Sequence, residues 1–137
     1  MASYKISEVE GIGPSFAKKL QVANVRSVNT LLKKGCTRQG RKAIAEKTGI
    51  DEGTVLKWVN MADLFRVKGV GSEYAELLEK AGVDTVKELR NRNAANLLGK
   101  MKEVNSSGRA LVRQLPGLAN VEAWIEHAKK LDPMVNY

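Results

Sequence analysis

The sequence predicts an all-α fold made of two copies of one helical unit. The first observation is an internal repeat, because residues 9–20 match residues 67–78 at an offset of 58. The second is a dense set of helix start and stop signals, and the third is the near absence of strand patterns. We therefore expect two tandem, packed subdomains, covering residues 1–64 and 65–137 without a flexible linker between them.

The repeat continues beyond its opening motif. At the same offset the matched apolar pairs are Val25/Val83, Val28/Val86 and Leu31/Leu89. Later the offset becomes 66, and the matched pairs are Val55/Val121, Trp58/Trp124, Val59/Ile125 and Ala62/Ala128. The second copy thus carries an eight-residue insertion, which we expect in the loop-like run at residues 105–108. The two tryptophans hold equivalent positions and are expected to lie in the core of each unit.

Capping residues predict four helices in each copy. In the first copy the helices start at or after Pro14, Ser27, Thr37 and Asp51 and end near Ala23, Lys34, Gly49 and Phe65. In the second copy they start at or after Ser72, Thr85, Asn93 and Asn120 and end near Ala81, Arg92, Val104 and Leu131. Residues 115–119 look like the start of a third hairpin, but Ala119 replaces the second glycine. We expect a helix-cap region there.

The charge of the chain favours a polyanionic partner. Lys and Arg number 23 against 15 Asp and Glu, a net charge of +8. Residues 1–66 carry a net charge of +6 and residues 67–137 a net charge of +2, so the first copy carries most of the field. The aromatic content of 5% argues against a stacking platform for single strands.

Several classes of protein are disfavoured by what the sequence lacks. One cysteine, Cys36, and one histidine, His127, give neither an internal disulfide nor a zinc site, so we expect no metal, no cofactor and a reducing compartment. No signal peptide or membrane-spanning run is visible, which indicates a cytoplasmic protein without a membrane partner. Neither His127 nor Asp84 has recognisable catalytic partners. We expect no enzyme activity and no catalytic residues.

Two glycine motifs carry the functional prediction. Gly11-Ile12-Gly13 and Gly69-Val70-Gly71 each lie between two predicted helices. Glycine permits positive φ and close approach of the backbone to a ligand, and the apolar residue between the glycines anchors the turn. The helix that follows directs its free N–H groups outward, which makes an anion site suited to a nucleic-acid phosphate.

At these residues the chain resembles the helix-hairpin-helix superfamily, whose pattern is apolar-x-Gly-apolar-Gly-x-x-x-Ala-x-x-Leu. It is similar to the SAM-like variety in which a short helix follows, as in small DNA-binding domains of recombinases and transcription factors. With its two tryptophan helices, the whole chain looks like an uncharacterised bacterial family of tandem modules. The resemblance implies contact with the sugar-phosphate backbone that is independent of sequence, made by hairpin amides and nearby basic side chains.

The resemblance and the charge pattern together predict one nucleic-acid interface, with DNA favoured over RNA. The residues carried over onto the first hairpin are Gly11, Gly13, Ser15, Lys18 and Lys19. A basic run adds Lys33, Lys34, Arg38, Arg41 and Lys42, and continues to Lys47. The second hairpin offers Gly69, Gly71 and Lys68, but Glu73, Glu76 and Glu79 follow it, so its glycines are expected to serve mainly to turn the chain.

Two other interpretations remain open from the sequence. Residues 41–58 resemble a DNA-binding helix-turn-helix with its recognition helix at residues 51–60. The acidic first turn of that helix favours two ordinary core helices instead. The rival function is a scaffold of the same fold that binds a protein partner or itself, since fold alone does not determine function.

Overall fold

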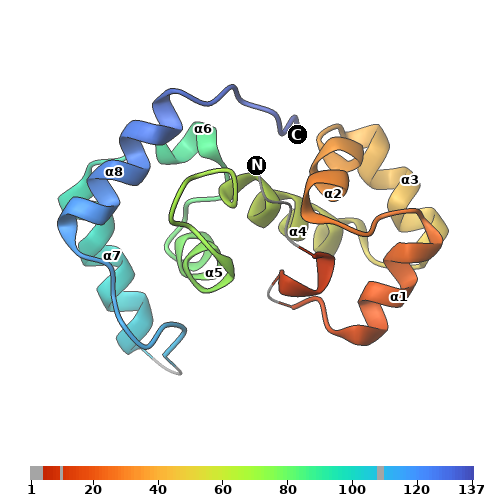
Figure 1. Cartoon of the computed structure of the whole chain (residues 1–137), viewed down its shortest axis with the longest axis horizontal. Helices are drawn as coiled ribbons and strands as arrows, with labels where there is room; N and C mark the ends of the chain where they lie inside the picture. Colours follow the sequence, from red (N-terminus) through yellow and green to blue (C-terminus); the bar gives the residue numbers. More distant parts are fainter. Residues whose placement is uncertain (1–4, 10, 108–109) are drawn as a thin grey trace. The chain divides into compact units, whose positions relative to one another are not determined.

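The computed structural model describes residues 5–9, 11–107 and 110–137. Within them the chain forms eight α-helices and one 3₁₀ turn, with no β-strand (Figure 1). An isolated bridge between Lys5 and Ser27 is the only strand-like pairing in that part of the chain. The predicted all-α class is confirmed.

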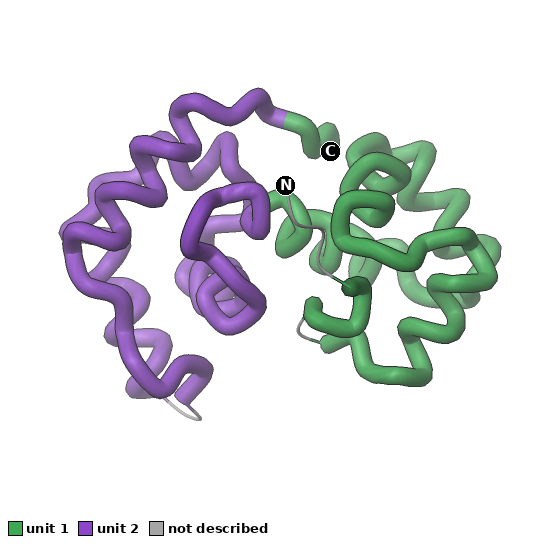
Figure 2. Tube along the Cα trace, viewed as in Figure 1, with its two compact units in different colours: residues 1–63, 134–137 green, residues 64–133 purple. Residues whose placement is uncertain are grey.

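The chain divides into two compact units (Figure 2). Unit 1 comprises residues 1–63 and 134–137, and unit 2 comprises residues 64–133. The repeat in the sequence gives no sign that residues 134–137 belong to unit 1. Each unit has an aliphatic core, with Leu20 and Leu31 fully buried in unit 1 and Leu78 and Leu89 fully buried in unit 2.

Unit 1 follows the helix boundaries expected from its caps. Its elements are η1 (Ile6–Glu8), α1 (Pro14–Val22), α2 (Val28–Gly35), α3 (Arg38–Thr48) and α4 (Glu52–Leu64). The hydroxyls of Ser27 and Thr37 accept backbone N–H groups at the starts of α2 and α3. Gly49 ends α3 in the left-handed conformation with φ of 74°. Asp51 accepts from two backbone N–H groups at the start of α4.

Unit 2 departs from the expected boundaries at two helices. Its elements are α5 (Ser72–Lys80), α6 (Val86–Leu89), α7 (Ala94–Ser106) and α8 (Leu118–Lys129). Helix α6 ends three residues before the predicted Arg92. Helix α8 begins after Gly117, so the predicted cap at Asn120 is wrong. The Asn120 side chain instead lies in the first turn, where its Oδ1 accepts from the Gly117 N–H at 3.0 Å.

The longer connection in the second copy starts within the expected run, two residues after its first residue, and extends well past it. Asn105 and Ser106 belong to α7, and residue 108 lies outside the described residues. Three residues, 49–51, link α3 to α4, whereas residues 107–117 link α7 to α8. The Asn105 amide holds this longer connection, because its Oδ1 accepts from the N–H groups of Leu111 and Val112 at 2.7 and 3.1 Å. A residue that looked typical of a loop thus ends a helix and ties a loop to it.

The tail at residues 134–137 is bound within unit 1 by hydrogen bonds. The Asn136 N–H donates to the Cys36 carbonyl at 2.7 Å, and the Arg41 guanidinium donates to the Asn136 carbonyl at 2.7 Å. The Tyr137 hydroxyl is 3.4 Å from Oδ1 of buried Asn60. These contacts span about a hundred residues of sequence, so local pattern analysis cannot find them.

The two glycine hairpins have the same backbone geometry. Gly11 and Gly69 have φ of 93° and 92°, in the region that L side chains rarely adopt. In each hairpin the N–H of the apolar residue between the glycines donates to the carbonyl of the residue three before it. The two distances are 3.0 Å from Ile12 to Val9 and 3.1 Å from Val70 to Val67. These turns direct α1 and α5 away from the preceding chain.

A tryptophan packs against each hairpin. Indole Nε1 of Trp58 lies 3.3 Å from where a Cβ on Gly11 would be, and Nε1 of Trp124 lies 3.1 Å from that position on Gly69. Both indoles are buried, as predicted. Each also contacts an aromatic ring on the helix after the hairpin, with centroid distances of 5.2 Å for Phe16–Trp58 and 5.1 Å for Tyr74–Trp124.

We expect Gly69→Ala to destabilise the fold and Gly71→Ala to be tolerated. At Gly69 a methyl group imposes positive φ on an L residue and presses on Trp124, at a cost of about 1–2 kcal/mol or more. Gly71 has φ of −99° and no atom within 4 Å of where its Cβ would be, so its change should cost less than about 1 kcal/mol. Urea unfolding followed by circular dichroism measures both, and equal losses would contradict the assignment.

Candidate nucleic-acid interface

The first hairpin presents an uncapped helix N-terminus. Gly13 is the N-cap of α1 and has no side chain to accept hydrogen bonds from the first turn. Pro14 has no N–H, and the first intrahelical bond runs from the Ala17 N–H to the Gly13 carbonyl at 2.9 Å. The N–H groups of Ser15 and Phe16 therefore have no partner within the helix, and both residues are exposed. Together with the helix dipole they favour an anion.

Two predicted lysines follow this turn on α1. Lys18 and Lys19 are exposed, and neither forms an ion pair within the described residues. Lys19 Nζ lies 5.6 Å from the centroid of the Phe16 ring, within the range of a cation–π contact. The first turns of α1 thus hold Ser15, Lys18 and Lys19, directly after the N-cap Gly13.

The basic run is divided between α2 and α3, and its members have different surroundings. Lys33 and Lys34 lie in the last turn of α2, and Arg38 and Lys42 lie on α3. All four residues are exposed. Arg38 lines a separate pocket together with Glu52 and Tyr137, so a carboxylate faces it. Of these four, only Lys34 reaches α1, where its Nζ donates to the Ala23 carbonyl at 3.2 Å.

Arg41 is removed from the predicted interface because its side chain is buried. Only 4% of the residue is exposed, and its guanidinium donates to the carbonyls of Gly35 at 2.8 Å and Asn136 at 2.7 Å. Burial lowers the pKa of the Arg41 guanidinium from its usual value. In the sequence Arg41 is one cation of a basic run. In the structure its hydrogen bonds join α2, α3 and the tail.

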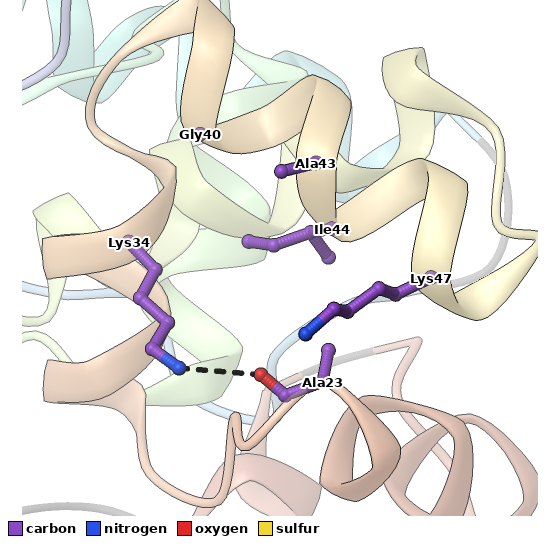
Figure 3. A pocket seen from close by; sticks show the side chains of 6 residues that line it. All are labelled: Ala23, Lys34, Gly40, Ala43, Ile44 and Lys47. Carbon is purple, nitrogen blue, oxygen red and sulfur yellow. Dashed lines mark hydrogen bonds between the residues drawn. The ribbon is translucent and has the colours of Figure 1, made fainter.

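A pocket at the C-terminal end of α1 brings in a lysine that the predicted site residues omit. This pocket, which we call the α1-end pocket, has a volume of about 230 Å³ and is lined by Ala23, Lys34, Gly40, Ala43, Ile44 and Lys47. In Figure 3, the side chains of Lys34 and Lys47 extend from α2 and α3 toward Ala23. Lys47 stands four residues after Ala43 on α3, a spacing that places the two on the same helix face.

The second hairpin differs in its charges. Lys68 is exposed, and its backbone N–H donates to His127 Nδ1 at 2.9 Å. His127 therefore supports the backbone of this hairpin, as an acceptor on α8. Beside the hairpin lies a pocket of about 390 Å³ lined by Gly69, Gly71, Ser72, Glu73, Tyr74, Arg113 and Gln114. Arg113 comes from the long α7–α8 connection, so sequence proximity did not reveal it, and Glu73 lies in the same pocket.

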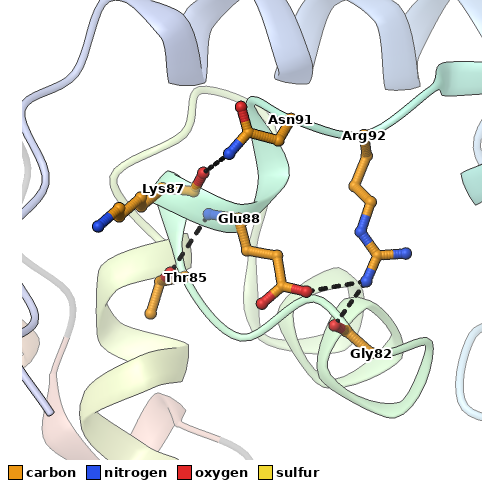
Figure 4. A network of polar contacts seen from close by, with 6 residues as sticks. All are labelled: Gly82, Thr85, Lys87, Glu88, Asn91 and Arg92. Carbon is orange, nitrogen blue, oxygen red and sulfur yellow. Dashed lines mark hydrogen bonds and ion pairs between the residues drawn. The ribbon is translucent and has the colours of Figure 1, made fainter.

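At the C-terminal end of α5 the charges are balanced by a polar network (Figure 4). The Arg92 guanidinium donates to the Glu88 carboxylate and to the Gly82 carbonyl, both at 2.9 Å. Burial raises the pKa of nearby Asp84, and the charges of Glu88 and Glu79 raise it further, whereas Arg92 lowers it. Unit 2 therefore neutralises its own cation here.

The structure does not favour the helix-turn-helix interpretation. A recognition helix must expose side chains along one face to enter a major groove. In α4 the residues Val55, Trp58 and Val59 are buried, and so is every residue from there to Leu64. The acidic start of α4, at Glu52, is its most exposed part. Helices α3 and α4 are therefore core helices that meet at Gly49.

The fold and the site define a class of small all-helical protein in which two hairpin-led units each pack around one tryptophan. Among the described residues, no helix is both long enough and apolar enough to cross a membrane. Residues 10–131 match a family described as a domain of unknown function, DUF4332, and the chain belongs to that family. Neither the curated proteins nor the solved structures contain a significant match.

Replacing Arg41 is expected to cost stability, whereas replacing its exposed neighbour Arg38 is not. Arg41→Met removes two hydrogen bonds to carbonyls and should lower the free energy of unfolding by about 2–4 kcal/mol. Arg38→Met removes the same charge from the same helix and should change it by less than about 0.5 kcal/mol. Chemical denaturation of both variants gives the two values. Similar losses of stability in the two variants would mean that the positive charge, and not the buried hydrogen bonds, stabilises the fold.

Asp84→Asn should stabilise unit 2 at neutral pH and lose this advantage in acid. Because the folded pKa of Asp84 is raised, stability present with the protonated carboxyl is lost as pH rises through that folded value. The difference in melting temperature between variant and parent should therefore move in favour of the variant between about pH 3 and about pH 7. Asp132→Asn, at an exposed carboxyl of the same unit, is the control. A pH-independent difference at Asp84 would contradict this account.

Proposed function

We propose that this protein is a helix-hairpin-helix protein that binds the sugar-phosphate backbone of nucleic acid, DNA in preference to RNA, without base specificity. The contact is made by the first hairpin. The N–H groups of Ser15 and Phe16 donate to a phosphate, and the ammonium groups of Lys18 and Lys19 neutralise it and its neighbour. Contacts of this kind position a protein on the strand without reading bases.

The observation that carries this proposal is Gly13. Its φ of −84° and ψ of −176° are open to any residue, and no atom lies within 4 Å of where its Cβ would be. Gly11 is different, because its positive φ explains its identity. A glycine that the backbone does not require, at an exposed and uncapped helix start, is explained by the close approach of a ligand to the backbone.

Charge supports the first hairpin over the second. Lys18 and Lys19 follow the first hairpin, and in the second hairpin the equivalent positions hold Glu76 and Leu77. Glu73 also lines the pocket beside the second hairpin. A phosphate there would meet a carboxylate, and only Lys68 and Arg113 oppose that repulsion. Gly71 is as free of steric demands as Gly13, so the charges, and not the glycine, lead us to assign the main contact to unit 1.

Gly13→Ala is expected to weaken nucleic-acid binding while leaving the fold intact. A methyl group at Gly13 separates the phosphate from the amides but has open space around it, so binding should fall by about tenfold or more. Gly71→Ala makes the same change in the second hairpin and should leave affinity unchanged. The measurement is fluorescence anisotropy of a labelled duplex and a labelled single strand at low and physiological salt, with unfolding curves recorded for each variant.

The same titration tests the two lysines. Lys18→Glu with Lys19→Glu should abolish binding, and the parent should show a log-log salt slope that steepens by about 0.9 for each phosphate contact. Lys129→Glu with Lys130→Glu changes the charge equally at another adjacent, exposed pair and should retain most of the affinity. If the parent binds neither strand at low salt, or if both double variants lose binding equally, the proposal fails.

One observation favours the scaffold alternative. On α1 the apolar residues Phe16 and Val22 are 37% and 72% exposed, more than an aliphatic core helix requires. A protein partner or a second copy of the chain would cover them. Sedimentation equilibrium of the parent separates the two functions, because a scaffold that associates with itself shows a mass that rises with concentration and is insensitive to the Lys18 and Lys19 changes.

A further inference from the structure

A cation at the same position of the repeat has different surroundings in the two units. Lys34 in unit 1 and Arg92 in unit 2 occupy the same position of the repeat. Each donates to a carbonyl just after the helix that follows the hairpin: Lys34 to Ala23 at 3.2 Å, and Arg92 to Gly82 at 2.9 Å. The two units therefore share the cation and its carbonyl contact, and they differ in the groups around it.

In unit 2 carboxylates of the chain neutralise this cation. Glu88 accepts from Arg92 at 2.9 Å, and Glu88 and Glu79 are close enough to Asp84 to raise its pKa. None of these carboxylates has an acidic counterpart in unit 1. The residues at the positions of Glu88, Asp84 and Glu79 are Thr30, Arg26 and Gln21.

Unit 1 instead adds a second cation and leaves space. Lys47 lines the α1-end pocket together with Lys34, and Figure 3 shows both side chains reaching toward Ala23. Gly40 and Ala43 add small groups to the lining, and Ile44, only 4% exposed, adds a buried aliphatic group. Gly40 is also needed for packing, because a Cβ there would meet the Lys34 carbonyl oxygen. No carboxylate is among its lining residues. Two cations that share a pocket with no anion are expected to attract one.

We propose that the α1-end pocket is a phosphate site, in which a phosphate group takes the place that the Glu88 carboxylate holds in unit 2. Lys34 and Lys47 donate to its oxygens, and the apolar lining accepts the group to which the phosphate is attached. The volume of about 230 Å³ is below the range of about 300–1,000 Å³ for drug-sized ligands, so the pocket takes little more than a phosphate and one sugar. This site is separate from the first hairpin and does not require that hairpin to bind.

A single substitution can supply a carboxylate from the chain itself at this site. Thr30 is the third residue of α2, and its N–H donates to the Ser27 cap at 3.1 Å, as the Glu88 N–H does to Thr85 at 3.4 Å. Thr30→Glu therefore reproduces the Thr85-x-x-Glu88 arrangement of unit 2, where the carboxylate pairs with the cation four residues on, and puts a carboxylate four residues before Lys34. The variant keeps every cation and should fold, but it places a carboxylate where we expect the phosphate.

The test is an NMR titration of the ¹⁵N-labelled full chain with inorganic phosphate at constant ionic strength. The parent should show saturable shifts at the amides of Ala23, Gly40 and Lys47, and Thr30→Glu should weaken this binding by about tenfold or more. Lys47→Gln should also weaken it, whereas Lys42→Gln, at an exposed position on the same helix outside the pocket, should not. The absence of saturable shifts in the parent, or equal binding by Thr30→Glu and the parent, would overturn the proposal.

Two further ligands identify the source of the phosphate. Adenosine monophosphate represents a free phosphate monoester, and a short single strand without terminal phosphate represents a nucleic-acid backbone. Competition by the strand at the Ala23 and Lys47 amides assigns the site to nucleic acid, and competition by the monophosphate alone assigns it to a small molecule. The Lys18→Glu, Lys19→Glu variant should retain the phosphate shifts, which separates failure of the hairpin from failure of this pocket.

Discussion

The contact between an indole and a glycine sets the geometry of both units. The hairpin glycine has no side chain, and the tryptophan from the last helix of the unit fills the space beside it. That packing ties the turn to a helix some fifty residues away in sequence and fixes the direction of the helix that follows the hairpin. Positive φ strains an L residue, so the hairpin position that packs against the tryptophan requires glycine. The proposed interface on the first hairpin depends on this pair in unit 1.

On this shared frame the two units carry different electrostatics. Within the described residues of unit 1, Lys18 and Lys19 form no ion pair, and the α1-end pocket that Lys34 and Lys47 line contains no carboxylate. Unit 2 has Glu76 where unit 1 has Lys18, pairs Arg92 with Glu88, and adds a long connection that carries Arg113. A duplicated fold can thus keep a similar core while the two copies carry different charges around it.

Sequence analysis recovered most of the fold because helix caps and apolar spacing are local signals. The caps at Ser27, Thr37 and Thr85 were identified by type alone, and the repeat located both tryptophans. Asn120 was misassigned because a polar side chain in the first turn can serve the cap from either side. Helix α6 ends early because the chain passes into tighter turns, in which the N–H groups of Asn91 and Arg92 donate to carbonyls three residues before them.

The candidate site was less predictable because exposure and distant contacts decide it. Arg41 and Lys42 are neighbours in sequence, yet one is buried under the tail and the other faces solvent. The pairing of Lys34 with Lys47 depends on how α2 and α3 meet the end of α1, and Arg113 reaches the second hairpin from a connection about forty residues away. None of these follows from the charge of a residue or its immediate neighbours.

The tail at residues 134–137 makes unit 1 a discontinuous domain. In chain order, unit 2 is inserted between two segments of unit 1, with covalent joins at both of its ends. Arg41 and Cys36 each receive one hydrogen-bond partner from the second segment. During synthesis, the buried guanidinium therefore lacks one of its two acceptors until the whole of unit 2 has been made. Unit 1 comes first in the sequence, yet it cannot complete its hydrogen bonds until residues that follow unit 2 have been made.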